Sequence, residues 1–306
     1  MSLPPVEAIS ANVEKGKNLA EAANWVRAQN PDIFFLQELQ PGQGEIVTEL
    51  TGMTGYIAAP TAQSSNDNAI FLREGGPLVF DEEFSHPWAP WHAPANIAVR
   101  FRDQDGTLSP RRIALVSAHL CYWSPQTRLA EAQWMSTLSK AGWLAMVFAD
   151  WNSYRQGEGG PWEGYQDAAF VANRTYLTSD GRRLTDDRPD RELTAAGFDE
   201  MARHAADHLG QRDAMRPTSG YRDHPGRPTG LPAYTIDRGY HTSELTPALE
   251  SFEVCDTPEL REYSDHLPQR ATYNATALRE ILHRPTRVYE PNTVTPGALT
   301  AGRKTS

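Results

Sequence analysis

Cysteine is scarce in this sequence: Cys121 and Cys255 are the only two among 306 residues. Two cysteines are too few for a disulfide-stapled scaffold or for a zinc site built from thiolates. We therefore expect two free thiols in a cytosolic protein, and a single disulfide is the alternative.

Long apolar runs are absent as well. No stretch approaches the roughly 18–20 apolar residues that a membrane-spanning helix needs, so no span is predicted. The first residues, Met-Ser-Leu-Pro-Pro, show neither the basic region nor the apolar region of a secretory signal. These absences predict a cytoplasmic location, and a mature secreted form is the alternative.

Positive charge is in deficit, with 29 basic against 39 acidic residues and a formal net charge of −10. A protein that holds a long duplex through many phosphate contacts is usually basic on at least one face. Tight, non-specific duplex binding is therefore not expected. Hydrolysis of a phosphate at a bound cation remains compatible with this charge, because the ion supplies local positive charge.

The residues that are present suit a packed core, since 39% are hydrophobic and eight are tryptophans. The length allows one large domain or two small ones. Apolar runs predict buried strands, and apolar residues at helical spacing predict helices between them. The predicted strands are 6–13, 32–36, 68–73, 96–102, 113–119, 143–149, 234–240, 249–254 and 268–273, and the predicted helices are 19–29, 125–140 and 191–209.

The order of these segments does not follow a strict alternation of strand and helix, and there is no internal repeat. It favours an α/β protein with mixed sheets and helices outside them. The polar interval at about 153–233 predicts an insertion over one end of a sheet. The polar residues 285–306 predict a C-terminal tail that is either flexible or wraps the surface.

Six segments place polar side chains where a predicted strand ends. Ends of strands on one edge of a sheet meet in a common cleft. Each residue alone has an ordinary structural explanation, such as a turn amide or a solvated acid, but chance does not readily supply all six in one chain. The residues are Asn12, Glu38, His119, the pair Asp150 and Asn152, Asp237, and the pair Asp265 and His266.

These segments, in this order, resemble the endonuclease/exonuclease/phosphatase superfamily. They read Ser-Ala-Asn12-Val, Leu-Gln-Glu38, Ser-Ala-His119-Leu, Ala-Asp150-Trp-Asn152, Ile-Asp237-Arg and Ser-Asp265-His266-Leu-Pro. The resemblance covers about residues 6–274. It implies a four-layer αββα sandwich of the deoxyribonuclease-I-like type, with residues 1–284 as a single catalytic domain.

The resemblance also implies a cation site. Glu38 would be the main ligand of a divalent cation, with Asp265 and Asn12 completing the shell. Oxygen ligands and a phosphate substrate favour Mg²⁺ or Mn²⁺ over zinc.

The remaining catalytic roles follow from the same resemblance. Asp150 would orient and deprotonate the attacking water, and Asn152 would hold the water or the phosphate in line. His266 would donate to the phosphoryl oxygen, with Asp237 fixing its tautomer. His119 would contact the phosphate or assist the leaving oxygen.

Three further features have two interpretations each. Asn68 either faces the substrate from a central strand or is an amide at a strand edge. Arg238 would place a cation at the mouth of the site, where it would bind substrate, or it would pair with Asp237. The segment 88–92, Trp-Ala-Pro-Trp-His, either stacks on bases or rings near the cleft or forms a proline-rich surface loop.

The predicted function is a metal-dependent phosphoester hydrolase, most simply a nuclease-like phosphodiesterase acting on nucleic acid or nucleotides. One alternative is a phosphatase of a small phosphorylated sugar, inositol or lipid headgroup. Another is an inactive relative that serves as a binding module. No protein partner is implied.

Overall fold

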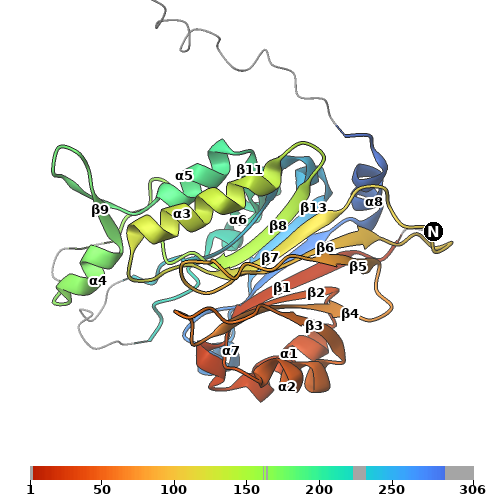
Figure 1. Ribbon diagram of the computed structural model, residues 1–306, viewed down its shortest axis with the longest axis horizontal. Coiled ribbons are helices and arrows are strands. Elements are labelled where there is room, and N and C mark those ends of the chain that lie inside the picture. The colour runs from red at the N-terminus through yellow and green to blue at the C-terminus, as the bar shows by residue number, and fades with distance from the viewer. Residues whose placement is uncertain (1–2, 161, 163–164, 223–231, 287–306) are drawn as a thin grey trace, which may run out of the picture.

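Two six-stranded sheets face each other, and helices cover their outer faces (Figure 1). The computed structural model describes residues 3–160, 162, 165–222 and 232–286. The strand order is β13-β14-β1-β2-β4-β3 in the first sheet and β11-β12-β8-β7-β6-β5 in the second. The strands of the first sheet are β1 (Val6–Asn12), β2 (Ile33–Leu39), β3 (Met53–Ile57), β4 (Asp67–Arg73), β13 (Leu249–Val254) and β14 (Gln269–Tyr273). Those of the second are β5 (Leu78–Glu83), β6 (Ala95–Phe101), β7 (Ile113–His119), β8 (Leu144–Asp150), β11 (Phe198–Glu200) and β12 (Asp237–Thr242).

Each sheet is mixed and contains one parallel pair. β1 runs parallel to β2 in the first sheet, and β7 runs parallel to β8 in the second. The other neighbours within these two sheets are antiparallel. The parallel pairs bring the carboxyl ends of two strands together in each sheet, which is the arrangement that gathers polar strand ends at one edge.

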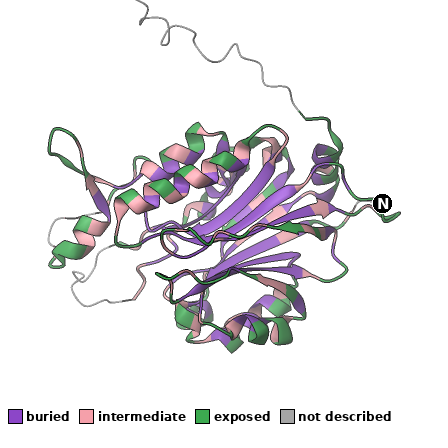
Figure 2. Cartoon of the chain, in the orientation of Figure 1, coloured by how far each residue is buried: buried purple, intermediate pink, exposed green. Residues whose placement is uncertain are grey.

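The facing sides of the two sheets form the largest apolar cluster, and the burial of the strands is visible in Figure 2. Phe35 of β2 and Phe148 of β8 lie across this interface with ring centroids 4.8 Å apart. Both are fully buried. Removing one such side chain from water stabilises the fold by about 1.5–3 kcal/mol.

The outer layers are helical. α1 (Leu19–Gln29) and α2 (Gln43–Thr51) cover the first sheet through buried Val26 and Val47. α3 (Pro125–Ser136) and α5 (Arg188–Ala195) cover the second sheet through buried Ala132 and Leu193. The layer order is therefore αββα, which confirms the predicted sandwich.

The remaining elements close the ends of the sandwich or extend from it. α6 (Met201–His208) and α8 (Ala275–His283) contribute apolar side chains to the core between the sheets. The smaller elements are η1 (Glu14–Gly16), η2 (Thr137–Ser139), α4 (Ala168–Asn173), β9 (Thr175–Leu177), β10 (Arg183–Thr185), η3 (Arg212–Met215), η4 (Ser243–Ala248) and α7 (Pro258–Tyr263).

Each of the nine predicted strands corresponds to an observed strand, but the single helix predicted at 191–209 is wrong. Gly197, with φ of +87°, follows α5, and this left-handed conformation favours glycine and ends the helix. Residues Phe198–Glu200 then pair with β12 as strand β11 before α6 begins. Helical spacing alone does not show this pairing, because β12 lies about forty residues further along the chain.

The polar interval 153–233 is partly integrated into the sandwich, since α5, β11 and α6 all belong to its layers. α4 and the two-stranded β9–β10 sheet extend beyond the large sheets, at the left of Figure 1. Residues 287–306, most of the predicted tail, lie outside the described residues.

Cys121 and Cys255 are both free thiols. Within the described ranges, no helix combines the length and the apolar character needed to cross a bilayer.

Candidate active site

Three of the predicted side chains lie at one level on neighbouring strands of the second sheet. β7 ends at His119 and β8 ends at Asp150, and the parallel register pairs these two residues. β12 begins at Asp237, which the antiparallel register places opposite Asp150. All three positions are buried. The sheet itself therefore places Asp150 between His119 and Asp237.

The first sheet contributes Glu38 through an irregularity in β2. Side chains of a regular strand alternate between faces, and Gln37 already points to the second sheet, where its Nε2 donates to Ser117 Oγ at 2.9 Å. The pairing of β2 with β4 shifts between Leu36 and Leu39, and Glu38 has a left-handed φ of +63°. This bulge lets Glu38 face the second sheet as well, at a small cost in backbone strain.

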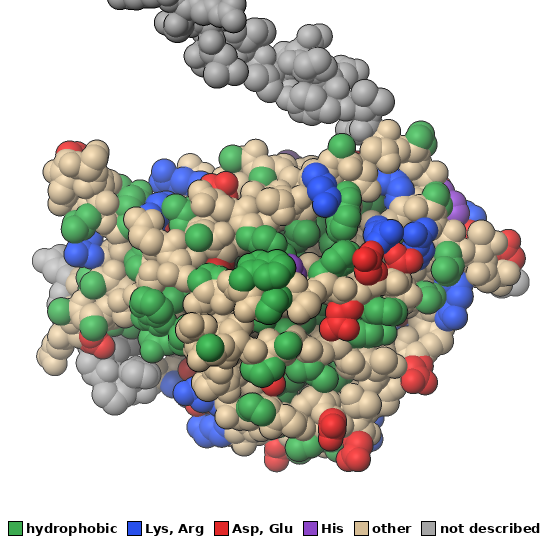
Figure 3. Space-filling view, in the orientation of Figure 1, with side chains coloured by type: hydrophobic (Ala, Val, Ile, Leu, Met, Phe, Trp, Pro, Cys, Tyr) green, Lys and Arg blue, Asp and Glu red, His purple; other side chains and the backbone are tan. Residues whose placement is uncertain are grey.

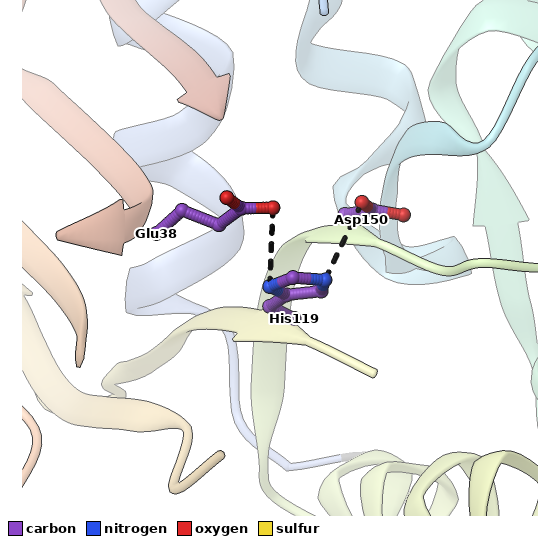
Figure 4. A group of neighbouring side chains, drawn as sticks. All are labelled: Glu38, His119 and Asp150. Carbon is purple, nitrogen blue, oxygen red and sulfur yellow. Dashed lines mark ion pairs between the residues drawn. The ribbon is translucent and has the colours of Figure 1, made fainter. Parts of the chain in front are cut away.

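The imidazole of His119 lies between the carboxylates of Glu38 and Asp150 (Figure 4). Its Nδ1 is 3.7 Å from Glu38 Oε1, and its Nε2 is 3.6 Å from Asp150 Oδ2. His119 Nδ1 is buried and has no hydrogen-bond partner among the described residues. A buried polar atom without a partner is costly, and it marks a position where a ligand can bind.

Asn12 connects the two carboxylates from the end of β1. Its Nδ2 donates to Glu38 Oε1 at 3.0 Å and lies 3.4 Å from Asp150 Oδ2. Its Oδ1 accepts the backbone N–H of Glu14 at 3.1 Å. Asn12 is only 2% exposed, so this amide holds the acidic groups of the two sheets at a fixed separation.

Asp237 and His266 form a buried pair beside Asp150. His266 Nδ1 lies 2.8 Å from Asp237 Oδ2, and its Nε2 lies 3.9 Å from Asp150 Oδ2. Burial lowers the pKa of His266, but the carboxylates of Asp237 and Asp150 outweigh it and raise the pKa well above its ordinary value. Burial also raises the pKa of Asp237, although the neighbouring His266 acts to lower it. We assign the retained proton to His266, because the carboxylates around this ring favour its cation.

Asp150 and Asn152 form a tight turn at the end of β8. The backbone N–H of Asn152 donates to Asp150 Oδ1 at 2.9 Å, and Asn152 has a left-handed φ of +48°. Asn152 Nδ2 donates to the carbonyl of Leu120 at 2.9 Å. Between them, buried Trp151 donates to the carbonyl of Arg238 at 3.0 Å. These bonds orient Asp150 so that Oδ2 faces the histidines.

His92 is a site residue that the sequence analysis missed. Its ring stacks on His119 with centroids 5.0 Å apart, and its Nδ1 lies 2.5 Å from Ser64 Oγ. Burial and the neighbouring His119 lower the pKa of His92 to about 3, so its ring is neutral. The sequence predicts a role for the indoles of the segment 88–92, whereas His92 is its residue that contacts the site.

Several solved structures are similar to this chain in fold. An endonuclease/exonuclease/phosphatase family protein from Bacteroides thetaiotaomicron is 14% identical, with a TM-score of 0.56 over 88% of this chain and 98% of that chain. TDP2 of D. rerio, complexed with single strand DNA product, is 16% identical, with a TM-score of 0.58 over 89% and 100%. A mannosyl-6-phosphatase from Bacteroides thetaiotaomicron is 15% identical, with a TM-score of 0.55 over 87% and 98%.

The chain has the endonuclease/exonuclease/phosphatase fold. The fold expected from the sequence resemblance is thereby confirmed. No protein-family model matches the sequence, and no curated protein matches it either.

Asp265, expected as a second metal ligand from the resemblance to endonuclease/exonuclease/phosphatase proteins, lies at the exposed side of the site. Its side chain is 42% exposed, and its Oδ1 is 3.9 Å from His266 Nε2. It belongs to neither of the two acid–histidine groups, within the described residues, that could hold an ion. Asp265 lies beside His266, and its role as a metal ligand stays a prediction.

Two residues predicted to bind substrate have buried structural contacts instead. Asn68 is 1% exposed, and its Nδ2 donates to the carbonyl of Ala93 at 2.8 Å. It thereby supports the loop that carries His92. Arg238 is fully buried and donates to Ser153 Oγ at 3.0 Å. Alternation along β12 explains this correction, because the residue after Asp237 must point to the other face of the sheet.

The side chains at the junction of the sheets could hold a divalent cation. Glu38, His119 and Asp150 each offer a ligand atom, and these atoms lie within 4.8 Å of one another. Two carboxylates suit Mg²⁺ or Mn²⁺, and the unpartnered His119 Nδ1 is a further donor atom. A second group, Asp150, Asp237 and His266, fits less well, because His266 already occupies the Asp237 carboxylate.

Proposed function

We propose that this protein is a metal-dependent phosphoester hydrolase that acts as a nuclease-like phosphodiesterase. The observation that carries this proposal is the meeting of Glu38, His119 and Asp150 with the Asp237–His266 pair in one site. Phosphoester hydrolysis needs a site for a cation, a base for water and a donor for the phosphoryl oxygens. This cluster contains side chains suited to each task.

Glu38 would be the main ligand of Mg²⁺ or Mn²⁺, with Asp265 and Asn12 as further predicted ligands. A bound ion would neutralise charge on the phosphate and on the leaving oxygen. Glu38 is suited to this role, because its side chain is 15% exposed at the junction of both sheets and is held by Asn12. The Oδ1 of Asn12 already accepts a backbone N–H. Asn12 therefore holds the Glu38 carboxylate in place, and its own side-chain oxygen is less available to the cation.

Asp150 would accept the proton of the attacking water. Its Oδ1 is held by the Asn152 N–H, which leaves Oδ2 facing the reacting groups. Asn152 would thus position the base through its backbone. This support keeps the carboxylate in one orientation before the substrate binds, which lowers the cost of reaching the transition state.

His266 would donate a hydrogen bond from Nε2 to a phosphoryl oxygen. Its Nδ1 is bonded to Asp237, which fixes the ring orientation and stabilises the cation. His119 also lies beside Asp150, and it would contact the phosphate from the side opposite to His266. The two histidines would then contact the phosphoryl group from two sides, while Asp150 accepts the proton of the attacking water.

A diester fits this site better than a monoester. A phosphomonoester carries a charge of nearly −2 at pH 7, whereas a diester carries −1. Among the described residues, no lysine or arginine forms an ion pair with Glu38, Asp150 or Asp237. His266 is the main protein cation near the phosphate and the proposed metal ion would supply the remaining positive charge, so the smaller charge of a diester needs less compensation.

A phosphatase of a small phosphorylated molecule is the second candidate. The net charge of −10 favours a small substrate over a long polyanion. The similar structures leave both classes open, since one is complexed with single strand DNA product and another is a mannosyl-6-phosphatase. An inactive binding module is the third candidate, and the convergence of intact acid and histidine side chains speaks against it.

A substrate panel with Mg²⁺, Mn²⁺ or chelator tests the proposal. The panel contains chromogenic mono- and diesters, supercoiled and single-stranded DNA, RNA, and inositol phosphates. Diester cleavage that requires the ion and is lost in Asp150→Asn and His266→Ala supports the proposal. Release of inorganic phosphate from monoesters alone would decide for the phosphatase. Absence of ion-dependent turnover across the panel would decide for the binding module.

A further inference from the structure

An apolar pocket adjoins the candidate active site, and His119 belongs to both. Its volume is about 150 Å³, and it lies between the loop before β6 and helix α3. The residues that matter for its chemistry are His86, Trp88, His92, His119, Glu131 and Trp134. We refer to it as the ring pocket.

The ring pocket is continuous with the site through a pair of stacked histidines. The rings of His92 and His119 are 5.0 Å apart and nearly parallel, at 27°, and both line the pocket. The Nε2 of His119 is at the same time 3.6 Å from Asp150 Oδ2. For a phosphoester bound at Asp150, the pocket would therefore lie within reach of one substituent, beside the His119 ring.

Aromatic groups shape the walls of the ring pocket. The rings of His86 and Trp134 meet edge to face, with centroids 4.4 Å apart at 70°. Trp88 is 78% exposed although it lines the pocket, so its indole is available to cover a ligand. Figure 3 shows hydrophobic side chains gathered at the centre of the viewed face. A dry cavity of roughly 150 Å³ holds one benzene ring, so the size suits a single planar ring.

Two polar side chains of the ring pocket, His86 and Glu131, are uncharged at neutral pH. Burial lowers the pKa of His86 and raises the pKa of Glu131 to about 8. The Glu131 carboxyl group also accepts the backbone N–H of Cys121 at 2.9 Å, which fixes its orientation. A phosphate would find no cationic partner here, whereas an uncharged ring would find stacking surfaces and a few hydrogen-bonding edges.

We propose that the ring pocket receives an uncharged planar ring carried by the phosphoester substrate, with this ring in contact with His119. This inference rests on the proposed function and narrows its substrate class. A nucleobase and an aryl ester share this chemistry. An aliphatic chain would gain burial but no stacking.

Binding to the full chain carrying Asp150→Asn, which prevents turnover, tests the inference by calorimetry with Mn²⁺ present. The ligands are thymidine 5′-monophosphate, phenyl phosphate, hexyl phosphate and methyl phosphate. Stacking of a ring on aromatic side chains predicts that one or both ring phosphates bind on the order of tenfold more tightly than methyl phosphate. Preference for thymidine 5′-monophosphate identifies a nucleobase, and preference for phenyl phosphate identifies an aryl ester. Hexyl phosphate binding as tightly as either would overturn the inference.

Two added substitutions locate the ring. Ala130 is exposed on α3 and lines the pocket, so Ala130→Phe fills it without disturbing the core. Ala130→Phe and Trp88→Ala should each remove most of the tenfold advantage. Trp123→Ala is the matched control, because Trp123 is 48% exposed but does not line the pocket. An unchanged advantage in Ala130→Phe, or an equal loss in Trp123→Ala, would overturn the inference.

These outcomes are separate from those of the proposed function. If the wild-type chain hydrolyses diesters but shows no preference for rings, only the ring pocket assignment fails. If the preference is present and no phosphoester is hydrolysed, only the proposed hydrolase fails.

Discussion

Nδ1 of His266 lies 2.8 Å from Oδ2 of Asp237, and both residues are buried where the two sheets meet. Asp237 begins β12 in the second sheet, whereas His266 precedes β14 in the first. The carbonyl of Asp237 also accepts a hydrogen bond from Gln269 of β14, which ties the same two strands together. This cross-sheet contact gives His266 a fixed ring orientation.

Replacing the carboxylate of this pair tests its catalytic role. Asp237→Asn should lower kcat/KM for a diester by roughly 10²–10⁴-fold, because His266 loses the group that sets its tautomer and stabilises its cation. The Nδ1–H resonance of His266 should shift or broaden in the NMR spectrum. Full activity with an unchanged resonance would contradict the assigned role.

The base is tested by Asp150→Asn. The new amide oxygen can still accept the Asn152 N–H, so the turn should remain intact while proton acceptance is lost. We expect kcat to fall by at least about a hundredfold, with little change in the thermal midpoint. Asp105→Asn is the control, since Asp105 is an exposed loop residue that also accepts a backbone N–H. Equal activity of the two variants would rule out Asp150 as the base.

Cation binding should be measurable without turnover. Excess Mn²⁺ should raise the thermal midpoint of the wild-type chain, since a ligand at 100 times its Kd stabilises the folded state by about 2.7 kcal/mol. Glu38→Gln should abolish most of this increase, and chelator should abolish activity. Exposed Glu49→Gln serves as the control. An identical midpoint increase in Glu38→Gln would place the ion elsewhere.

A buried ion pair joins α3 to the segment before α5. Asp186 Oδ2 accepts from Arg128 Nη2 at 2.7 Å, and both side chains are fully buried. Asp186→Asn leaves the Arg128 charge without its partner, so the free energy of unfolding should fall by about 3 kcal/mol in urea titrations. Arg182→Met removes an exposed ion pair with Asp180 and should change the midpoint little. A small effect of Asp186→Asn would show that the carbonyls of Cys121 and Asn173, which also accept from Arg128, compensate for the lost carboxylate.

The stability of the fold should decrease in acid, partly through His241. This ring is fully buried between Tyr273 Oη and Thr246 Oγ1, and burial lowers its pKa to about 3. Below its ordinary pKa of 6.5 the unfolded chain binds a proton that the folded chain does not, so stability is lost as the pH falls from 6.5 toward 3. At pH 4 this amounts to about 3 kcal/mol.

The variant His241→Gln isolates that contribution. Urea unfolding at several pH values should show a shallower loss of stability in the variant between pH 6.5 and 4. Curves with the same slope would mean that His241 is protonated in the folded protein.

Local features of the sequence were sufficient to predict the strands that carry the site. The apolar run 113–119 is strand β7, and His119 ends it, as predicted. The stop after the first helix is also local, because Asn30 takes the left-handed conformation at its C-terminus. Short edge strands such as β3 and β5 were missed, since their alternation is weak and their pairing partners stabilise them.

The sequence by itself determined which acids, amides and histidines follow buried strands, because apolar runs and the residues that end them are local properties. Only the tertiary structure decided which of these side chains meet. The bulge that turns Glu38 inward, the alternation that buries Arg238 and the stacking of His92 on His119 depend on the register and packing of distant strands. Those contacts form only when both sheets close around a common core, so no single segment encodes them.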